Sequence, residues 1–225
     1  MLNLFILLLE RVGLIILIAY ILMNINHFKS MMNDREKRRS QWQLIIIFGC
    51  FSMLSNFTGV QIRGDEIING TVYNHLSPDA SLANTRVLTI GVSGLIGGPF
   101  VALAVSLISG IYRVYIGGAD AYIYLISSII IALVSGYFGH KAMRANRYPT
   151  IVKGALIGGA TEIIQMLCIL VFSDNTSHAW TLVKLIALPM ISINSIGTAI
   201  FLSIILSTIK KEEETRAIQT HDVLQ

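Results

Sequence analysis

Two arginines in apolar surroundings are the residues of this sequence best suited to chemistry. Arg86 and Arg113 flank the apolar, glycine-rich segment 87–112. A guanidinium presents a planar fork of N–H donors that matches a carboxylate or a phosphate, and a second cation nearby favours a small anion over a neutral ligand. Asn84 or Thr85, just before Arg86, can cap a helix whose free N–H groups would add to anion binding. The alternative is that each arginine only reaches lipid headgroups.

Three polar residues of the segment 119–140 extend this candidate site. Asp120, Tyr124 and Ser127 recur at spacings of four and three, so a helix would place them on one face. That face could present hydroxyls to a ligand and a carboxylate to balance one arginine. It could equally be a polar stripe that satisfies its own hydrogen bonds within a helical bundle.

Further polar residues lie in the apolar segments nearer the C-terminus. Glu162 and Gln165 are three residues apart and share a helical face, and Asn194 lies in the last apolar segment. Ionisable residues inside a membrane segment are costly, so each is a functional candidate. For Gln165 and Asn194 we favour hydrogen-bonded pairing of helices.

No catalytic motif accompanies these residues. The sequence has no nucleophile beside a base, no H-E-x-x-H, no phosphate loop and no CxxC pair. Cys50 and Cys168 both lie in apolar runs, which indicates packing residues. We therefore expect no catalytic residue, metal site or cofactor in this chain.

The composition indicates the elements that must position the candidate site. Of 225 residues, 54% are hydrophobic and only 13% are charged, and the mean hydropathy is +0.67. The charged share is about half that of a soluble domain. The net charge of +4 does not indicate nucleic-acid binding, because the basic residues cluster at the ends of apolar segments. We predict an all-α, polytopic integral membrane bundle.

The apolar segments define the predicted crossings. A helix needs about 20 apolar residues to cross roughly 30 Å of hydrocarbon. Five segments meet this length: 4–23, 43–62, 119–140, 151–172 and 180–209. A sixth, 87–112, is long enough but is interrupted by Gly97, Gly98 and Pro99.

The charges between the segments indicate which loops face the cytoplasm. The basic segments 29–39 and 141–153 should be cytoplasmic, whereas 63–84 holds one arginine against three acids and should be outside. The chain must then cross an odd number of times between residues 84 and 141. The simplest solution is that 87–112 enters the membrane and returns, with its turn at Gly97-Gly98-Pro99. The alternative is a full sixth span and one loop that violates the charge rule.

Several blocks of the sequence resemble the membrane sensor domain of LytS-type histidine kinases. The blocks are 81–99 (Ser-Leu-Ala-Asn-Thr-Arg to Gly-Gly-Pro), 109–118, 162–166, 188–190, 194–197 and 219–224. The resemblance implies a five-span sensor domain over 1–209. It also implies that 210–225 begins a cytoplasmic signalling helix leading to GAF-like and kinase domains. The resemblance implies that ATP binds to that kinase module. The chain alone is then expected not to be an enzyme, although the intact protein that it resembles is one.

The resemblance also implies a function in the bacterial cell membrane. Such a sensor would form a homodimer, detect a small extracellular carboxylate such as pyruvate or the state of the membrane, and phosphorylate a LytR-type response regulator that governs murein hydrolase export and autolysis. Arg86, Arg113 and Ser127 match ligand-binding positions of the family, whereas its pyruvate-sensing branch has a cysteine where this sequence has Tyr124. Two alternatives remain. One is a small-solute transporter or a substrate-capturing component of one, because broken helices also occur there. The other is a sensor of membrane potential.

Overall fold

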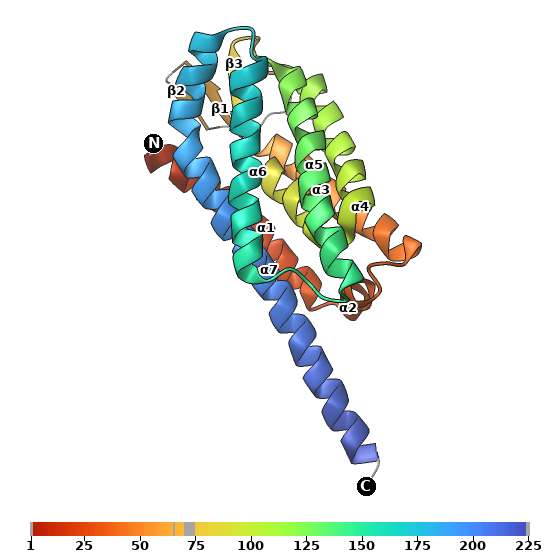
Figure 1. Ribbon diagram of the computed structural model, residues 1–225. Coiled ribbons are helices and arrows are strands. Elements are labelled where there is room, and N and C mark those ends of the chain that lie inside the picture. The colour runs from red at the N-terminus through yellow and green to blue at the C-terminus, as the bar shows by residue number, and fades with distance from the viewer. Residues whose placement is uncertain (1, 65, 70–74, 224–225) are drawn as a thin grey trace.

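The computed structural model describes residues 2–64, 66–69 and 75–223, and its architecture is helical, as predicted (Figure 1). A small antiparallel sheet caps one end of the bundle. The helices are α1 (Leu2–Met23), α2 (Asn26–Asn33), α3 (Arg38–Phe57), α4 (Arg86–Ile116), α5 (Ala121–Arg144), α6 (Ile151–Phe172) and α7 (Thr176–Val223). The strands are β1 (Val60–Arg63), β2 (Glu66–Ile68) and β3 (Ala80–Ala83).

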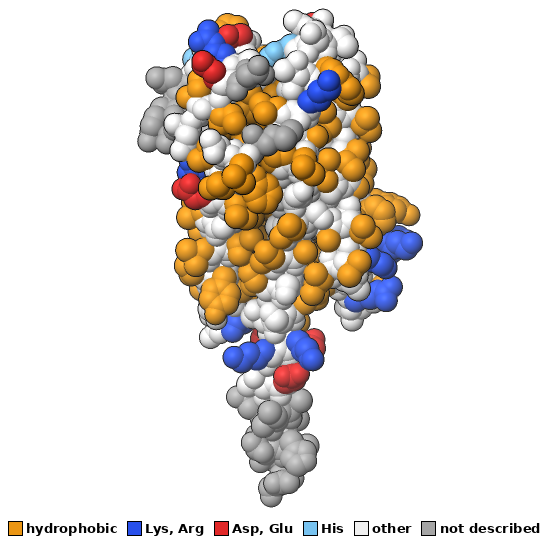
Figure 2. All heavy atoms as spheres, turned by 90° about the vertical axis from the view of Figure 1, so that its left-hand side faces the viewer, with side chains coloured by type: hydrophobic (Ala, Val, Ile, Leu, Met, Phe, Trp, Pro, Cys, Tyr) orange, Lys and Arg blue, Asp and Glu red, His pale blue; other side chains and the backbone are white. Residues whose placement is uncertain are grey.

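The surface supports a membrane location. Within the described ranges, five helices are long and apolar enough to cross a membrane: α1, α4, α5, α6 and, over Thr176–Thr215, α7. In Figure 2, apolar side chains cover the middle of the visible face, and most charged side chains gather at its two ends. We call the end that carries the segments 29–39 and 141–153 the inner face, and the end with the sheet the outer face.

The helix α4 is not a straight span, because its chain reverses at Gly98. Gly98 has φ 76° and ψ −171°, a conformation that residues other than glycine rarely adopt, and Pro99 follows it. In a straight helix Arg86 and Arg113 would lie about 40 Å apart. Instead both guanidinium groups lie over the ring of Tyr124, at 5.6 and 4.5 Å from its centre. The hairpin predicted from Gly97, Gly98 and Pro99 is therefore present, with residues 86–97 and 99–116 as its two arms.

The helix α3 runs the height of the bundle beside the second arm. At the inner face Trp42 packs edge-on against Phe100, with ring centres 5.7 Å apart, and at the outer face Phe57 packs against Tyr112 at 5.2 Å. Polar residues in its first two turns lower the mean hydropathy of α3, which is therefore not among the five helices named above. Because α4 folds back and α3 runs beside it, we infer that the crossings are α1, α3, α5, α6 and α7.

One predicted boundary is wrong. The segment 43–62 was expected to be helical throughout, but α3 ends at Phe57 and Val60–Arg63 form β1. In this strand the buried Val60 and Ile62 alternate with Gln61 and Arg63, and a period of two is the pattern of a strand with one buried face.

The outer sheet ties the two ends of the hairpin together. Its strand order is β2-β1-β3, with both pairs antiparallel. The strand β3 leads into the first arm, and the backbone N–H of Ala119, beyond the second arm, donates to the carbonyl oxygen of Ala80 at 2.8 Å. An exposed ion pair joins Arg63 Nε to Asp79 Oδ2 at 2.5 Å, and this hydrogen bond lowers the pKa of Asp79. Residues 63–84, predicted only as an outer segment, thus include two of the strands.

The inner face holds the tip of the hairpin through a buried arginine. Arg35 donates to the carbonyl oxygens of Ile96 at 3.3 Å and Arg147 at 2.6 Å, and its guanidinium lies 3.6 Å from the ring centre of Tyr148. Burial lowers the pKa of Arg35 and raises the pKa of Tyr148 to about 12. The tip therefore lies at the level of the inner loops, so both arms pass through most of the bundle.

This arrangement predicts which sites a membrane-impermeant thiol reagent reaches. In a Cys50→Ser, Cys168→Ser background, we expect Ser77→Cys to be labelled in intact cells, because it lies on the outer face. Ser30→Cys and Ala145→Cys should be labelled only after permeabilisation. All three positions are exposed. Labelling of Ala145→Cys from outside would contradict the hairpin topology.

Candidate anion-binding site at the hairpin

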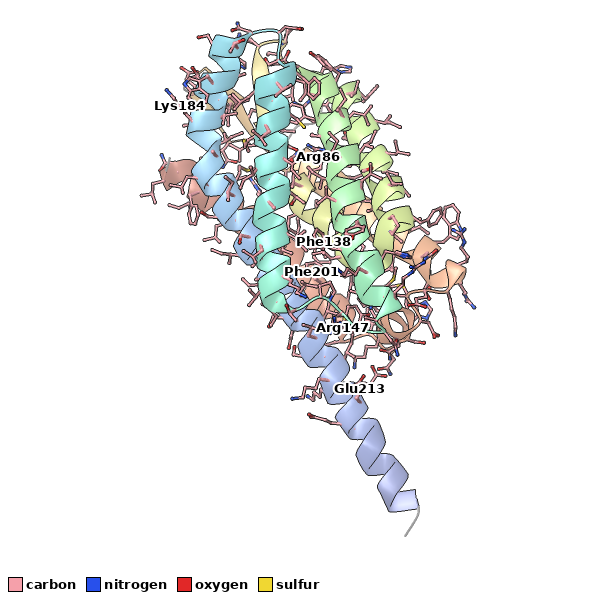
Figure 3. All side chains as sticks on the ribbon, viewed as in Figure 1. Arg86, Phe138, Arg147, Lys184, Phe201 and Glu213 are labelled. Atoms are coloured by element: carbon pink, nitrogen blue, oxygen red, sulfur yellow. The ribbon has the colours of Figure 1, made fainter. Side chains whose placement is uncertain are left out.

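Arg86 and Arg113 lie at opposite ends of the hairpin in sequence. The reversal of the chain brings them to one place in the bundle. Arg86 is the first residue of the first arm, and Arg113 lies in the last turn of the second. Both side chains are fully buried, at 0% exposure. The aromatic ring of Tyr124, from α5, attracts both cations through its π face. Figure 3 shows Arg86 inside the bundle beside α5.

Arg86 is held by polar groups of two neighbouring helices. Its Nη1 donates to the carbonyl oxygen of Tyr124 at 2.9 Å and to the hydroxyl of Ser128, and its Nη2 donates to Oε1 of Gln165 at 2.8 Å. These acceptors are neutral. They orient the guanidinium without cancelling its charge.

Arg113 is less satisfied than Arg86. Its Nη1 donates to the carbonyl oxygen of Gly117, but its Nε and Nη2 are buried without a hydrogen-bond partner among the described residues. Unpaired buried donors cost free energy, and an unpaired buried charge costs more. Neither Arg113 nor Arg86 forms an ion pair within the part of the chain that the structure describes. The site therefore has the donors and the charge for an anion.

Asn84 connects the site to α3. Its Nδ2 donates to Oδ1 of Asn56 at 2.9 Å, and its Oδ1 accepts from the backbone N–H of Arg86 at 3.2 Å. Asn56 in turn donates to the carbonyl oxygen and the hydroxyl of Ser109, both at 3.3 Å. Thr85 is the N-cap residue of α4, and its side chain makes no capping bond. Asn84 instead accepts from the backbone N–H of Arg86 and links both arms through Asn56.

Of two more predicted residues, Gln165 contacts Arg86 and Ser127 contacts Gln165. Ser127 lies 3.3 Å from Oε1 of Gln165, the atom that also accepts from Arg86. Gln165 therefore joins α6 to the hairpin and to α5. Its hydrogen bonds do pair helices, as we favoured, but through the arginine of the candidate site.

Glu162 and Asn194 form a separate polar pair one turn deeper. Asn194 Nδ2 donates to Glu162 Oε2 at 2.7 Å, and both residues are fully buried. This bond pairs α6 with α7, the function we favoured for Asn194. It places a polar connection between the helix that holds Gln165 and the longest helix of the bundle.

Asp120 does not join the arginines. Its φ of 49° and ψ of 37° are left-handed, and α5 begins only at Ala121. Its carboxylate instead accepts from the hydroxyl of Ser173, in the link between α6 and α7. Shared helical spacing does not place Asp120 beside Tyr124, because the residue lies outside the regular helix. The expected charge balance is wrong for this residue.

Three contributors were missed at the sequence level: Asn56, Ser109 and Ser128. Each is a polar residue within an apolar run, which was the only available signal. Serine is common in membrane helices, so this signal alone does not distinguish a site from helix packing. Their relevance follows from the fold, which directs them at Asn84 and Arg86.

Comparison with known proteins agrees with the architecture. Residues 25–208 match the family model described as 5TMR of 5TMR-LYT. The whole chain is 92% identical to Sensor protein LytS of Staphylococcus saprophyticus and 72% identical to that of Staphylococcus epidermidis. It is 60% identical to Sensor histidine kinase/phosphatase LytS of Staphylococcus aureus. The chain spans 38% of the length of each of these relatives. No solved structure matches it.

Proposed function

The chain belongs to the 5TMR family of 5TMR-LYT proteins, a multi-pass bacterial membrane family, and we propose that it is the input domain of a sensor histidine kinase. Its ligand is a small extracellular carboxylate of the pyruvate class. The kinase module phosphorylates a LytR-type response regulator that controls autolysis and murein hydrolase export, and the protein acts as a homodimer. The names of the relatives support a sensor and a kinase. The two arginines support a small anion, and pyruvate is what the resemblance to LytS-type sensors implies.

The observation that carries the proposal is the state of Arg113. Its Nε and Nη2, which have no partner among the described residues, lie in a buried site that already holds the cation Arg86. A carboxylate offers two oxygens to such a fork and neutralises part of the local charge. Both guanidinium groups lie against the ring of Tyr124, at 5.6 and 4.5 Å from its centre, which favours a ligand of few atoms that contacts both.

A route from the site to the output helix follows from the polar contacts. The ligand would bridge the two arms of the hairpin, and Arg86 is bonded to Gln165 of α6. Glu162, on the same helix, is bonded to Asn194 of α7. The helix α7 extends beyond the bundle at the inner face (Figure 1). A ligand that binds one arrangement of the hairpin more tightly would shift the population of α7 positions.

Thermal unfolding of the purified chain with matched ligands tests the proposal. We expect pyruvate to raise the melting temperature and pyruvamide, its neutral isostere, to leave it unchanged. A ligand at 100 times its dissociation constant stabilises a protein by about 2.7 kcal/mol. Equal stabilisation by pyruvamide, or none by a panel of short carboxylates including lactate and acetate, would reject a carboxylate sensor.

A further inference from the structure

A cavity of about 340 Å³ lies between the inner ends of α5 and α6, and its lining shares no residue with the arginine site. Its wall includes Phe138 and Ala142 of α5, Tyr148 of the connecting loop and Ile157 of α6. Figure 3 shows Phe138 and Arg147 toward this end of the bundle. The cavity is therefore largely apolar on its inside.

The rim of the cavity is basic. Lys141, Arg147 and Lys153 line it, and none of the described acidic residues does. All three are exposed, and none forms an ion pair within the described part of the chain. Three uncompensated cations around one opening favour an anionic occupant.

The same opening faces the membrane. Leu156, which lines the cavity, is 68% exposed, and its neighbour on the helix surface, Val152, is 69% exposed. On membrane-spanning helices such side chains contact acyl chains. A basic pocket between transmembrane helices, at the level of the inner loops, is the arrangement that binds acidic lipid headgroups.

We propose that this cavity binds the phosphate headgroup of an anionic phospholipid of the inner leaflet. The basic rim contacts the phosphate, and the acyl chains lie along Leu156 and Phe138. Two residues of the cavity wall also contact Arg35, which holds the hairpin tip. Tyr148 stacks on Arg35, and the carbonyl oxygen of Arg147 accepts a hydrogen bond from Arg35. A bound lipid would therefore influence the position of the hairpin tip, and this effect does not depend on which ligand the arginine site binds.

Native mass spectrometry of the delipidated chain in detergent tests the proposal. We expect phosphatidylglycerol to bind at least about tenfold more than phosphatidylcholine at equal concentration. The triple variant Lys141→Gln, Arg147→Gln, Lys153→Gln should bind both lipids only as much as the parent chain binds phosphatidylcholine. Ala142→Trp, which fills the cavity and keeps every charge, should also lose the preference.

The matched control removes the same charge from the same face. Lys29→Gln, Arg39→Gln, Lys210→Gln alters three basic residues outside the cavity and should keep the preference for phosphatidylglycerol. The proposal is overturned if this control loses the preference as well, or if the cavity variants keep it. A further test is whether glycerol 3-phosphate displaces bound phosphatidylglycerol as effectively as added phosphatidylglycerol does. That result would show a site for soluble anions and would also overturn the proposal.

Discussion

Arg113→Met is expected to abolish the thermal stabilisation by pyruvate, with binding weakened at least about 30-fold, or roughly 2 kcal/mol. Methionine fills similar space without the guanidinium, so the ligand loses the donors Nε and Nη2, which have no partner among the described residues. The measurement is the dissociation constant from ligand-dependent melting. Arg113→Lys keeps a charge but not the fork, and it should bind with intermediate affinity.

The same variant has a second readout that a purely structural residue would not give. Without ligand, Arg113→Met should melt at or above the temperature of the parent chain, because an unpaired buried charge is replaced by an apolar side chain. Arg63→Met, which removes an exposed arginine of the outer sheet, should bind pyruvate like the parent. A strong loss of stability in ligand-free Arg113→Met would instead indicate that Arg113 is a structural residue.

Gly139→Ala is expected to separate α5 from the hairpin and to destabilise the chain by about 3 kcal/mol or more, at the upper end of overpacking costs. A Cβ at this position would lie 1.9 Å from the carbonyl oxygen of Gly94, which is backbone and has no rotamer to change. The nearby Gly136 meets Pro99 in the same way, so the contact continues toward the tip. The measurement is the melting temperature in detergent, together with loss of the pyruvate effect.

Gly13→Ala is the matched control for this substitution. It makes the same change in the helix α1, where an added Cβ meets nothing within 4 Å. Because alanine favours helix over glycine by up to about 1 kcal/mol, the control should be as stable as the parent or slightly more so. If Gly139→Ala and Gly13→Ala had the same melting temperature, the close approach of α5 and the hairpin would not contribute to stability.

The hairpin accounts for both the burial and the location of the site. Every residue from Arg86 to Gly98 is buried, so the first arm is surrounded by protein rather than lipid. Non-helical backbone at membrane depth requires such shelter. The sheet at the outer face and Arg35 at the inner face hold the two ends of this element. A ligand between the arms would thus act on a segment that is fixed at its ends.

The sequence alone determined the class of protein and the position of the turn. Scarcity of charge indicated a membrane bundle, and the distribution of basic residues required an odd number of crossings between residues 84 and 141. Gly98 and Pro99 then indicated where the extra segment reverses. These inferences succeed because they depend on local backbone preferences and on the cost of moving charge into lipid, which each segment carries by itself.

Only the tertiary structure decided which polar residues meet. It brought Ser128 and Gln165 to Arg86, connected Asn84 to Asn56, and placed Asp120 against Ser173 instead of an arginine. Helical spacing gives the face that a residue occupies but not the rotation or height of the neighbouring helix. Those depend on how closely the helices approach, as at Gly139, and on packing between segments that are distant in the chain. The candidate site is a product of that packing.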